Sequence, residues 1–141
     1  MSRQAGFTLL ELVMVITLLG ILSVSAYSRF ADEDTFAVRV EQESLMAALN
    51  QAQQLAIIGQ TVQFVISSSG VYRVRSGGVD FSLGGITYPR TVHRDISLSP
   101  TSLSLSYDSL GRTSATTITL NSATGGSLSV CLENSGYAHG C

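Results

Sequence analysis

Two apolar patterns in the first part of the chain predict two kinds of helix. An apolar run from Phe7 to Tyr27 contains one charge, Glu11, and would measure about 30 Å as an α-helix, enough to cross a bilayer. From about residue 35 to 58, apolar residues recur at near-helical spacing, which predicts an amphipathic helix that stops at Gly59. The apolar positions of this second helix are Phe36, Val40, Leu45, Ala48, Leu49, Ala52, Leu55 and Ala56.

The rest of the chain alternates apolar and polar residues with a period of two, which predicts short antiparallel strands. Residues 61–66 and 71–75 flank a turn at Ser67 to Gly70, so we expect a β-hairpin there. Further alternation follows at Ile96 and Leu98, Leu103 to Tyr107, Ile118 and Leu120, and Leu128 to Leu132. The expected fold is α+β: a long N-terminal helix, with a membrane-spanning half and an amphipathic half, packed on an antiparallel β-sheet domain with strands from about 61 to 133.

The charge composition of the sequence argues against a nucleic-acid partner. Charged residues make up 13% of the chain, the net charge is −2, and the basic residues are all arginines. These arginines are scattered, and the close pair Arg73 and Arg75 alternates along a predicted strand. The sequence therefore predicts no basic face for nucleic acid or anionic lipid.

The two cysteines, Cys131 and Cys141, both lie near the C-terminus. Their spacing suits a disulfide that closes a tail over residues 131–141, if this part of the chain is exported. Together with His139 they form a C-x7-H-x-C pattern, which is not a zinc-binding spacing, so we expect no metal.

No motif in the sequence supports catalysis. His93 and Asp95 lie two residues apart and would share one strand face, but the G-x-S-x-G turn of serine hydrolases is absent. The sequence also lacks a phosphate-binding loop and a dinucleotide-binding fingerprint. We therefore expect neither an enzyme nor a cofactor.

Glu11 is the residue that a plain membrane anchor does not explain. An acidic side chain within a membrane span costs about 2.5 to 3.5 kcal/mol at the centre and less near an end. One alternative is that Glu11 only interacts with the helix dipole at the start of the helix. A cleaved secretory signal fits poorly, because the apolar run is long and ends in Tyr27, Ser28 and Arg29 instead of a small-residue cleavage site.

The N-terminal residues Gly6, Phe7, Thr8, Leu9, Leu10 and Glu11, with the apolar run behind them, resemble the processing and methylation motif of type IV pilins and type II secretion pseudopilins. The resemblance implies that residues 1–6 are a prepilin leader and that a prepilin peptidase cuts between Gly6 and Phe7 and methylates the new amine on Phe7. It also implies that residues 7–28 remain as a transmembrane and assembly helix and that residues 29–141 form an exported globular domain.

In such a protein, Glu11 has a role in assembly. The carboxylate of one subunit can pair with the Phe7 ammonium of its neighbour, which compensates two charges among apolar helices and sets their axial register. Many members of this family have a proline before the Arg-Phe pair where this chain has Ser28, so the resemblance does not imply a proline kink there. Gly20 and the small residues Ser23, Ser25 and Ala26 leave local bending open.

The segments 48–58, 106–112 and 128–136 look like the GspH/FimT type of minor pilin or pseudopilin. This resemblance implies a long helix on two antiparallel sheets, carried on the periplasmic side of the bacterial inner membrane and later in a pilus or pseudopilus. The implied partners are prepilin peptidase, other pilin subunits, the inner membrane and its assembly platform. The implied function is that of a structural subunit, a minor pilin or pseudopilin assembled into, or initiating, a type IV pilus, including the mannose-sensitive haemagglutinin type. The alternatives are a minor pseudopilin of a type II secretion system, a DNA-binding minor pilin for uptake, and a membrane-anchored enzyme.

Overall fold

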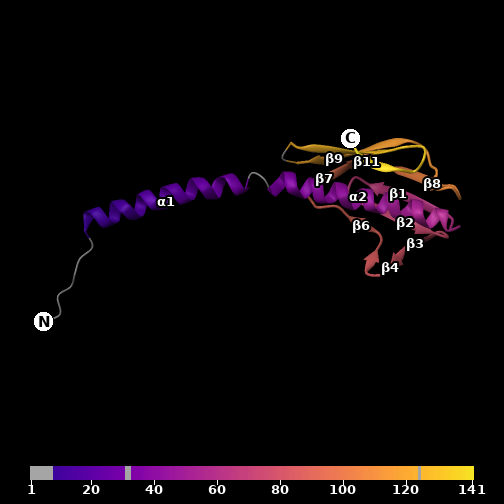
Figure 1. The fold of residues 1–141 in the computed structure, drawn as a ribbon, viewed down its shortest axis with the longest axis horizontal. Helices are drawn as coiled ribbons and strands as arrows, with labels where there is room; N and C mark the ends of the chain where they lie inside the picture. Colours follow the sequence, from indigo (N-terminus) through magenta and orange to yellow (C-terminus); the bar gives the residue numbers. More distant parts are fainter. Residues whose placement is uncertain (1–7, 31–32, 124) are drawn as a thin grey trace. The chain divides into compact units, whose positions relative to one another are not determined.

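The computed structural model describes residues 8–30, 33–123 and 125–141, and these residues form two compact units that divide between Glu33 and Asp34 (Figure 1). The first unit contains helix α1 (Leu9–Phe30). The second contains almost all of helix α2 (Glu33–Ile57) and every strand. The predicted leader 1–6 and Phe7 lie outside the described residues.

Neither described helix supports the predicted membrane-spanning half. Within the part of the chain that the structure covers, no helix combines the length and the apolar character that crossing a membrane needs. The α+β class, with helices followed by antiparallel strands, is confirmed.

Helix α2 ends where the sequence predicts. Gly59 has a φ of 91°, and its N–H donates to the carbonyl oxygen of Ala56 at 2.9 Å, while the N–H of Gln60 donates to that of Leu55 at 3.1 Å. These two bonds form a Schellman motif, which requires a left-handed residue that glycine adopts without strain. Gly59 therefore fixes the point at which the chain leaves the helix and enters the first sheet.

The face of α2 that packs on the sheets differs in part from the prediction. Leu45, Leu49, Ala52 and other predicted positions are buried, but Phe36 and Val40 are 69% and 45% exposed. Val38 is buried in their place. Since a step of two residues rotates about 200° around a helix, Phe36 and Val40 lie on the side opposite Val38. The prediction that Phe36 and Val40 belong to the core face is wrong.

The first sheet is antiparallel with strand order β3-β2-β1-β8, and β6 also pairs with β2. Its strands are β1 (Val62–Ser68), β2 (Val71–Ser76), β3 (Val79–Asp80), β6 (Arg90–Thr91) and β8 (Leu103–Tyr107). The hairpin formed by β1 and β2 confirms the one predicted over residues 61–75. On the inner face Val62, Phe64 and Ile66 are buried, as the period-two pattern requires.

The second sheet is also antiparallel, with order β11-β10-β9-β7. Its strands are β7 (Ile96–Ser99), β9 (Thr116–Ser122), β10 (Ser127–Leu132) and β11 (Ala138–Gly140). A separate two-stranded ribbon pairs β4 (Ser82–Leu83) with β5 (Ile86–Thr87). The longer strands fall on the predicted runs, whereas β11 and the two-residue strands were not predicted.

Helix α2 lies alongside both sheets, and their buried side chains form one core cluster (Figure 1). Side-chain amides fasten the helix at points along its length. Gln42 Nε2 donates to the carbonyl oxygen of Ser129 at 2.7 Å, and Gln53 Nε2 donates to that of Ser135 at 2.9 Å. The Tyr88 hydroxyl donates to Gln51 Oε1 at 3.0 Å. These bonds fix the helix to β10, to the loop between β10 and β11, and to the loop between β5 and β6.

Candidate functional site

The first turn of α1 holds the carboxylate singled out in the sequence. Thr8 caps the helix: the N–H of Glu11 lies 3.3 Å from Thr8 Oγ1 and 3.1 Å from the Thr8 carbonyl oxygen. Glu11 occupies the third helical position, the spacing of a T-x-x-E capping box. This signal was present in the sequence and would have predicted Thr8 as the helix start.

The surface of α1 offers apolar side chains on every side. All side chains described in this unit, residues 8–23, are exposed, and most are leucine, valine, isoleucine or methionine. A helix that is apolar all round is typical of one that packs among apolar neighbours. Glu11, at the N-terminal end where the helix dipole favours an anion, is the acidic residue of this first turn.

Two hydroxyl groups in the described part of α1, those of Thr17 and Ser23, bond within the helix. Thr17 Oγ1 donates to the carbonyl oxygens of Val13 and Met14, at 3.0 and 2.8 Å, and Ser23 Oγ donates to that of Leu19 at 2.7 Å. Such back-bonding lets a hydroxyl lie in apolar surroundings without an outside partner. Among the side chains described in residues 8–23, Glu11 is the one group that carries a charge. Gly6 and Phe7 lie outside the described residues, so the cleavage site and the pairing of Glu11 with Phe7 stay predictions.

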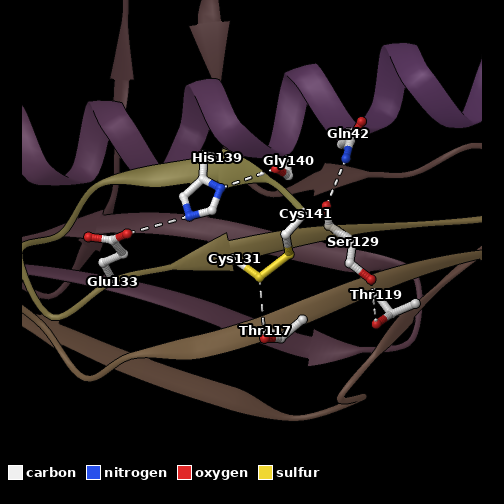
Figure 2. Close-up of a disulfide and its surroundings, with 9 residues drawn as sticks. All are labelled: Gln42, Thr117, Thr119, Ser129, Cys131, Glu133, His139, Gly140 and Cys141. Carbon is white, nitrogen blue, oxygen red and sulfur yellow. Dashed lines mark hydrogen bonds and ion pairs between the residues drawn. A yellow bond between two sulfur atoms is a disulfide. The ribbon is translucent and has the colours of Figure 1, made fainter.

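The predicted C-terminal loop is closed in the structure by a disulfide between Cys131 and Cys141 (Figure 2). Their Cα atoms are 5.8 Å apart, within the usual range for a bridge. The N–H of Cys141 donates to the carbonyl oxygen of Ser129 at 3.1 Å, so the end of the chain is tied to β10 by a covalent and a hydrogen bond. Both sulfurs are committed to each other, which leaves no thiolate for the metal alternative with His139.

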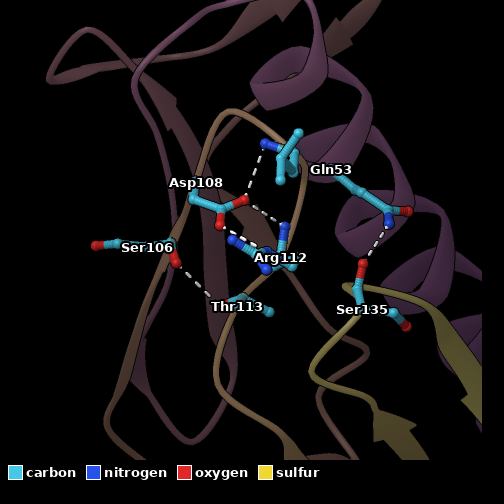
Figure 3. Close-up of polar contacts among 7 residues, drawn as sticks. Gln53, Ser106, Asp108, Arg112, Thr113 and Ser135 are labelled. Carbon is cyan, nitrogen blue, oxygen red and sulfur yellow. Dashed lines mark hydrogen bonds and ion pairs between the residues drawn. The ribbon is translucent and has the colours of Figure 1, made fainter.

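The turn between β8 and β9 is built around one carboxylate (Figure 3). Asp108 Oδ1 accepts from the N–H of Arg112 at 2.8 Å and from that of Leu110 at 2.9 Å, and Asp108 Oδ2 accepts from Arg112 Nε at 2.9 Å. Bonding from the Arg112 backbone, then its side chain, and from the Leu110 backbone lowers the pKa of Asp108 below its usual range. The sequence analysis singled out residues 106–112 only through the family resemblance and did not identify Asp108 as the centre of a turn.

The arginine pair noted in the sequence is part of an ion-pair cluster. Arg73 Nη1 and Arg75 Nε lie 3.4 and 3.6 Å from the two carboxylate oxygens of Asp80 on β3. The carboxylate offsets part of the positive charge, so the two arginines do not present a bare basic surface to phosphate groups.

His93 and Asp95 do not share a strand face, contrary to the expectation from their spacing. They lie in the loop between β6 and β7, where His93 Nδ1 is 3.5 Å from Asp95 Oδ2 and Arg94 Nε is 3.4 Å from the same oxygen. A surface pocket of about 340 Å³ includes these residues with Ser97 and Asn121. The Asp95 carboxylate lies between the exposed Arg94 guanidinium and the exposed His93 imidazole, an arrangement that holds the loop.

Comparison with known protein families identifies the N-terminal segment. Residues 1–27 match the family described as the prokaryotic N-terminal methylation motif, a stretch that contains Gly6, Phe7, Thr8 and Glu11. No curated protein and no solved structure matches the chain. The motif, together with the capped first turn that carries Glu11, indicates a type IV pilin-like protein.

Proposed function

We propose that this chain is a minor pilin, a structural subunit and not an enzyme. Prepilin peptidase cuts the chain between Gly6 and Phe7, which removes the leader, and then methylates the amine of Phe7. The N-terminal helix of the processed chain joins or initiates a type IV pilus. The observation that carries the proposal is the methylation motif over residues 1–27, with Glu11 in the capped first turn of an otherwise apolar helix.

The chemistry of the first turn supports this role. Cleavage creates an ammonium group on Phe7, one turn before Glu11. Among the side chains described in residues 8–23, the Glu11 carboxylate is the charged group that can pair with such an ammonium. Within a bundle of such helices, an unpaired charge is costly and a pair formed between subunits fixes how far one helix slides past the next. The ion pair therefore sets the axial alignment of neighbouring helices more than it adds to the net stability of the bundle.

The remaining features fit an exported subunit that is first anchored in the inner membrane and later lies in the pilus. A disulfide closes the C-terminal loop, and disulfides persist in oxidising compartments such as the periplasm. On this proposal the partners are prepilin peptidase, other pilin subunits, the inner membrane and its assembly platform.

Substitution of Glu11 tests the proposal. We expect Glu11→Ala to lose its leader and reach the membrane like the parent chain, but to be strongly depleted from sheared surface filaments. Glu133→Ala, which removes an exposed carboxylate directly after β10, is the matched control and should leave incorporation unchanged. Equal incorporation of the Glu11→Ala chain would contradict the register role.

A type II secretion pseudopilus is the second candidate, because its subunits share the same N-terminal motif. Deleting the gene separates the two: loss of surface filaments favours the pilus, and loss of enzyme secretion with filaments intact favours the pseudopilus. Gly6→Ala, which should block removal of the leader, tests whether the chain is a membrane-tethered enzyme. A tethered enzyme would keep its activity with the leader attached, whereas a pilin would lose its function.

A further inference from the structure

A groove open to solvent lies between helix α2 and residues 86–90, which run from β5 into β6. Its volume is about 340 Å³, inside the range of about 300 to 1,000 Å³ that is usual for small-ligand sites. The helix contributes two small side chains to its wall, Ala47 and Ala48. Because alanine ends at Cβ, these positions leave space that a larger residue would fill. The other wall includes Ile86, Tyr88 and Arg90.

Hydrogen bonds hold the two walls of the groove in place. The Tyr88 hydroxyl donates to Gln51 Oε1 at 3.0 Å, which ties the segment to the helix. Just beyond β6, the N–H of Val92 donates to the carbonyl oxygen of Gly70 at 2.9 Å, which ties the segment to the first sheet. A groove whose walls are already fixed loses little conformational freedom when a ligand enters it.

Arg90 gives the groove a positive charge that the protein does not neutralise. It pairs across the strands with Tyr72 of β2, and such partners place their side chains on the same face of a sheet. Tyr72 is buried in the core that α2 covers, so Arg90 also projects towards the helix side. Among the residues that the structure describes, no carboxylate makes an ion pair with its guanidinium. Glu41 of α2 instead accepts from the N–H of His93 at 3.1 Å.

The helix wall carries carboxamide groups that are not used elsewhere in the described part of the protein. Gln51 accepts from Tyr88 through its Oε1, so the two N–H groups of that amide remain available. Asn50 and Gln54 also line the groove, and their side chains make no hydrogen bond to another described residue. Carboxamides both donate and accept hydrogen bonds. They therefore match a ligand whose body carries several hydroxyl groups.

We propose that this groove binds an acidic sugar whose carboxylate pairs with Arg90. The hydroxyl groups of the sugar bond to the carboxamides of Asn50, Gln51 and Gln54, and the two alanines offer apolar surface to its ring. A guanidinium binds a carboxylate through two parallel hydrogen bonds. One unpaired cation matches the single charge of a carboxylate, whereas a phosphate group carries up to about two charges. The inference concerns the globular unit and adds a ligand to a chain proposed above as a structural subunit.

Titration of the purified full chain, in a detergent without a sugar headgroup, tests the proposal. D-glucuronate is the probe, D-glucose is the matched neutral sugar, and acetate carries the carboxylate without the hydroxyl groups. Amide chemical shifts measured by NMR report both the affinity and the place of binding. We expect glucuronate to shift the amides of Ala47, Gln51 and Arg90. Glucose and acetate should bind at least about tenfold more weakly, since each lacks one of the two sets of contacts.

Two substitutions and a matched control locate the site. Arg90→Gln removes the charge and should weaken glucuronate binding at least about tenfold, so that glucuronate and glucose bind alike. Ala47→Leu fills the groove from an exposed helix position and should abolish binding of glucuronate while the circular dichroism spectrum stays unchanged. Arg94→Gln removes an arginine whose side chain is 86% exposed and lies outside the groove, and it should leave binding unchanged.

The other outcomes would each overturn the proposal. Glucuronate binding that both Arg90→Gln and Ala47→Leu leave unchanged would mean a different site. Acetate that binds as tightly as glucuronate, or a short glutamate-containing peptide that binds more tightly, would overturn the sugar as the ligand. No shift at about 10 mM glucuronate, which would largely saturate a site of about 1 mM affinity, would overturn binding itself. None of these results depends on leader cleavage or entry into filaments, so they are independent of the Glu11→Ala test.

Discussion

Gly136, in the turn between β10 and β11, should be among the positions least tolerant of any side chain. Its φ is 85°, and a Cβ atom there would overlap the carbonyl oxygen of Gly111 and lie 2.8 Å from Gln53 Nε2. The left-handed backbone alone costs an alanine about 1 to 2 kcal/mol. Because the overlapping atom belongs to the backbone, no change of rotamer relieves it, and the two turns must separate.

Separation of the turns adds a second cost to Gly136→Ala. It breaks the bond from Gln53 Nε2 to the Ser135 carbonyl oxygen, a hydrogen bond of the kind that contributes about 1 kcal/mol, and loosens the packing around it. We expect a total loss of about 3 kcal/mol in the free energy of unfolding, and a melting temperature about 12 °C lower for a unit of this size.

Gly84→Ala is the matched control for Gly136→Ala. Gly84 also has a positive φ, 62°, but nothing lies within 4 Å of its Cβ position. It should therefore show the backbone cost alone, about 1 to 2 kcal/mol. Denaturant unfolding of the purified full chain, followed by circular dichroism, measures both variants. Equal losses for the two would refute the collision between the turns as a source of the effect.

Three other predictions follow from the same unit. Replacing Cys131 and Cys141 by serine should lower the free energy of unfolding by about 3 kcal/mol, the value expected for closing a short loop, and thermal unfolding with and without reductant checks it. Burial raises the pKa of Tyr72 to about 12, above its unfolded value of 10.0, so stability should be complete below pH 10 and fall as the pH rises towards 12. Tyr72→Phe should weaken that alkaline loss in pH-dependent unfolding, though not abolish it, because burial also raises the pKa of Tyr107. Asp108→Ala should speed hydrogen exchange at the amides of Leu110 and Arg112, which it accepts from, and leave exchange in β1 unchanged.

The sequence predicts the long strands well because burial on one face imposes a period of two on at least four residues. Ile118 and Leu120, or Leu128, Val130 and Leu132, can be read directly as inward positions. A two-residue strand such as β4 has no period to detect, and β11 is formed because the disulfide and the β10 edge hold residues 138–140 beside them. Those elements depend on tertiary contacts and could not be predicted locally.

For α2 and for the candidate functional residues too, local features could be predicted from the sequence and tertiary ones could not. Helical spacing located α2 but did not identify its inner face at the N-terminal end. Apolar residues occur there on both sides of the helix: Val38 faces the core, whereas Phe36 and Val40 face outward. Glu11 could be found from the sequence because the residues around it form a recognisable motif. The roles of Asp108 and Gln53 depend on turns that meet only after folding, so no local pattern indicates them.

The covalent loop at the C-terminus has a mechanical consequence when the chain is under tension. When the chain is pulled from its two ends, the disulfide carries the force directly from Cys131 to Cys141, which are separated by 10 positions. Those positions would otherwise add about 35 Å of extended chain. Tension can therefore not peel β11 from β10 by drawing out the tail, and the sheet edge yields only when β10 itself is pulled from its neighbours.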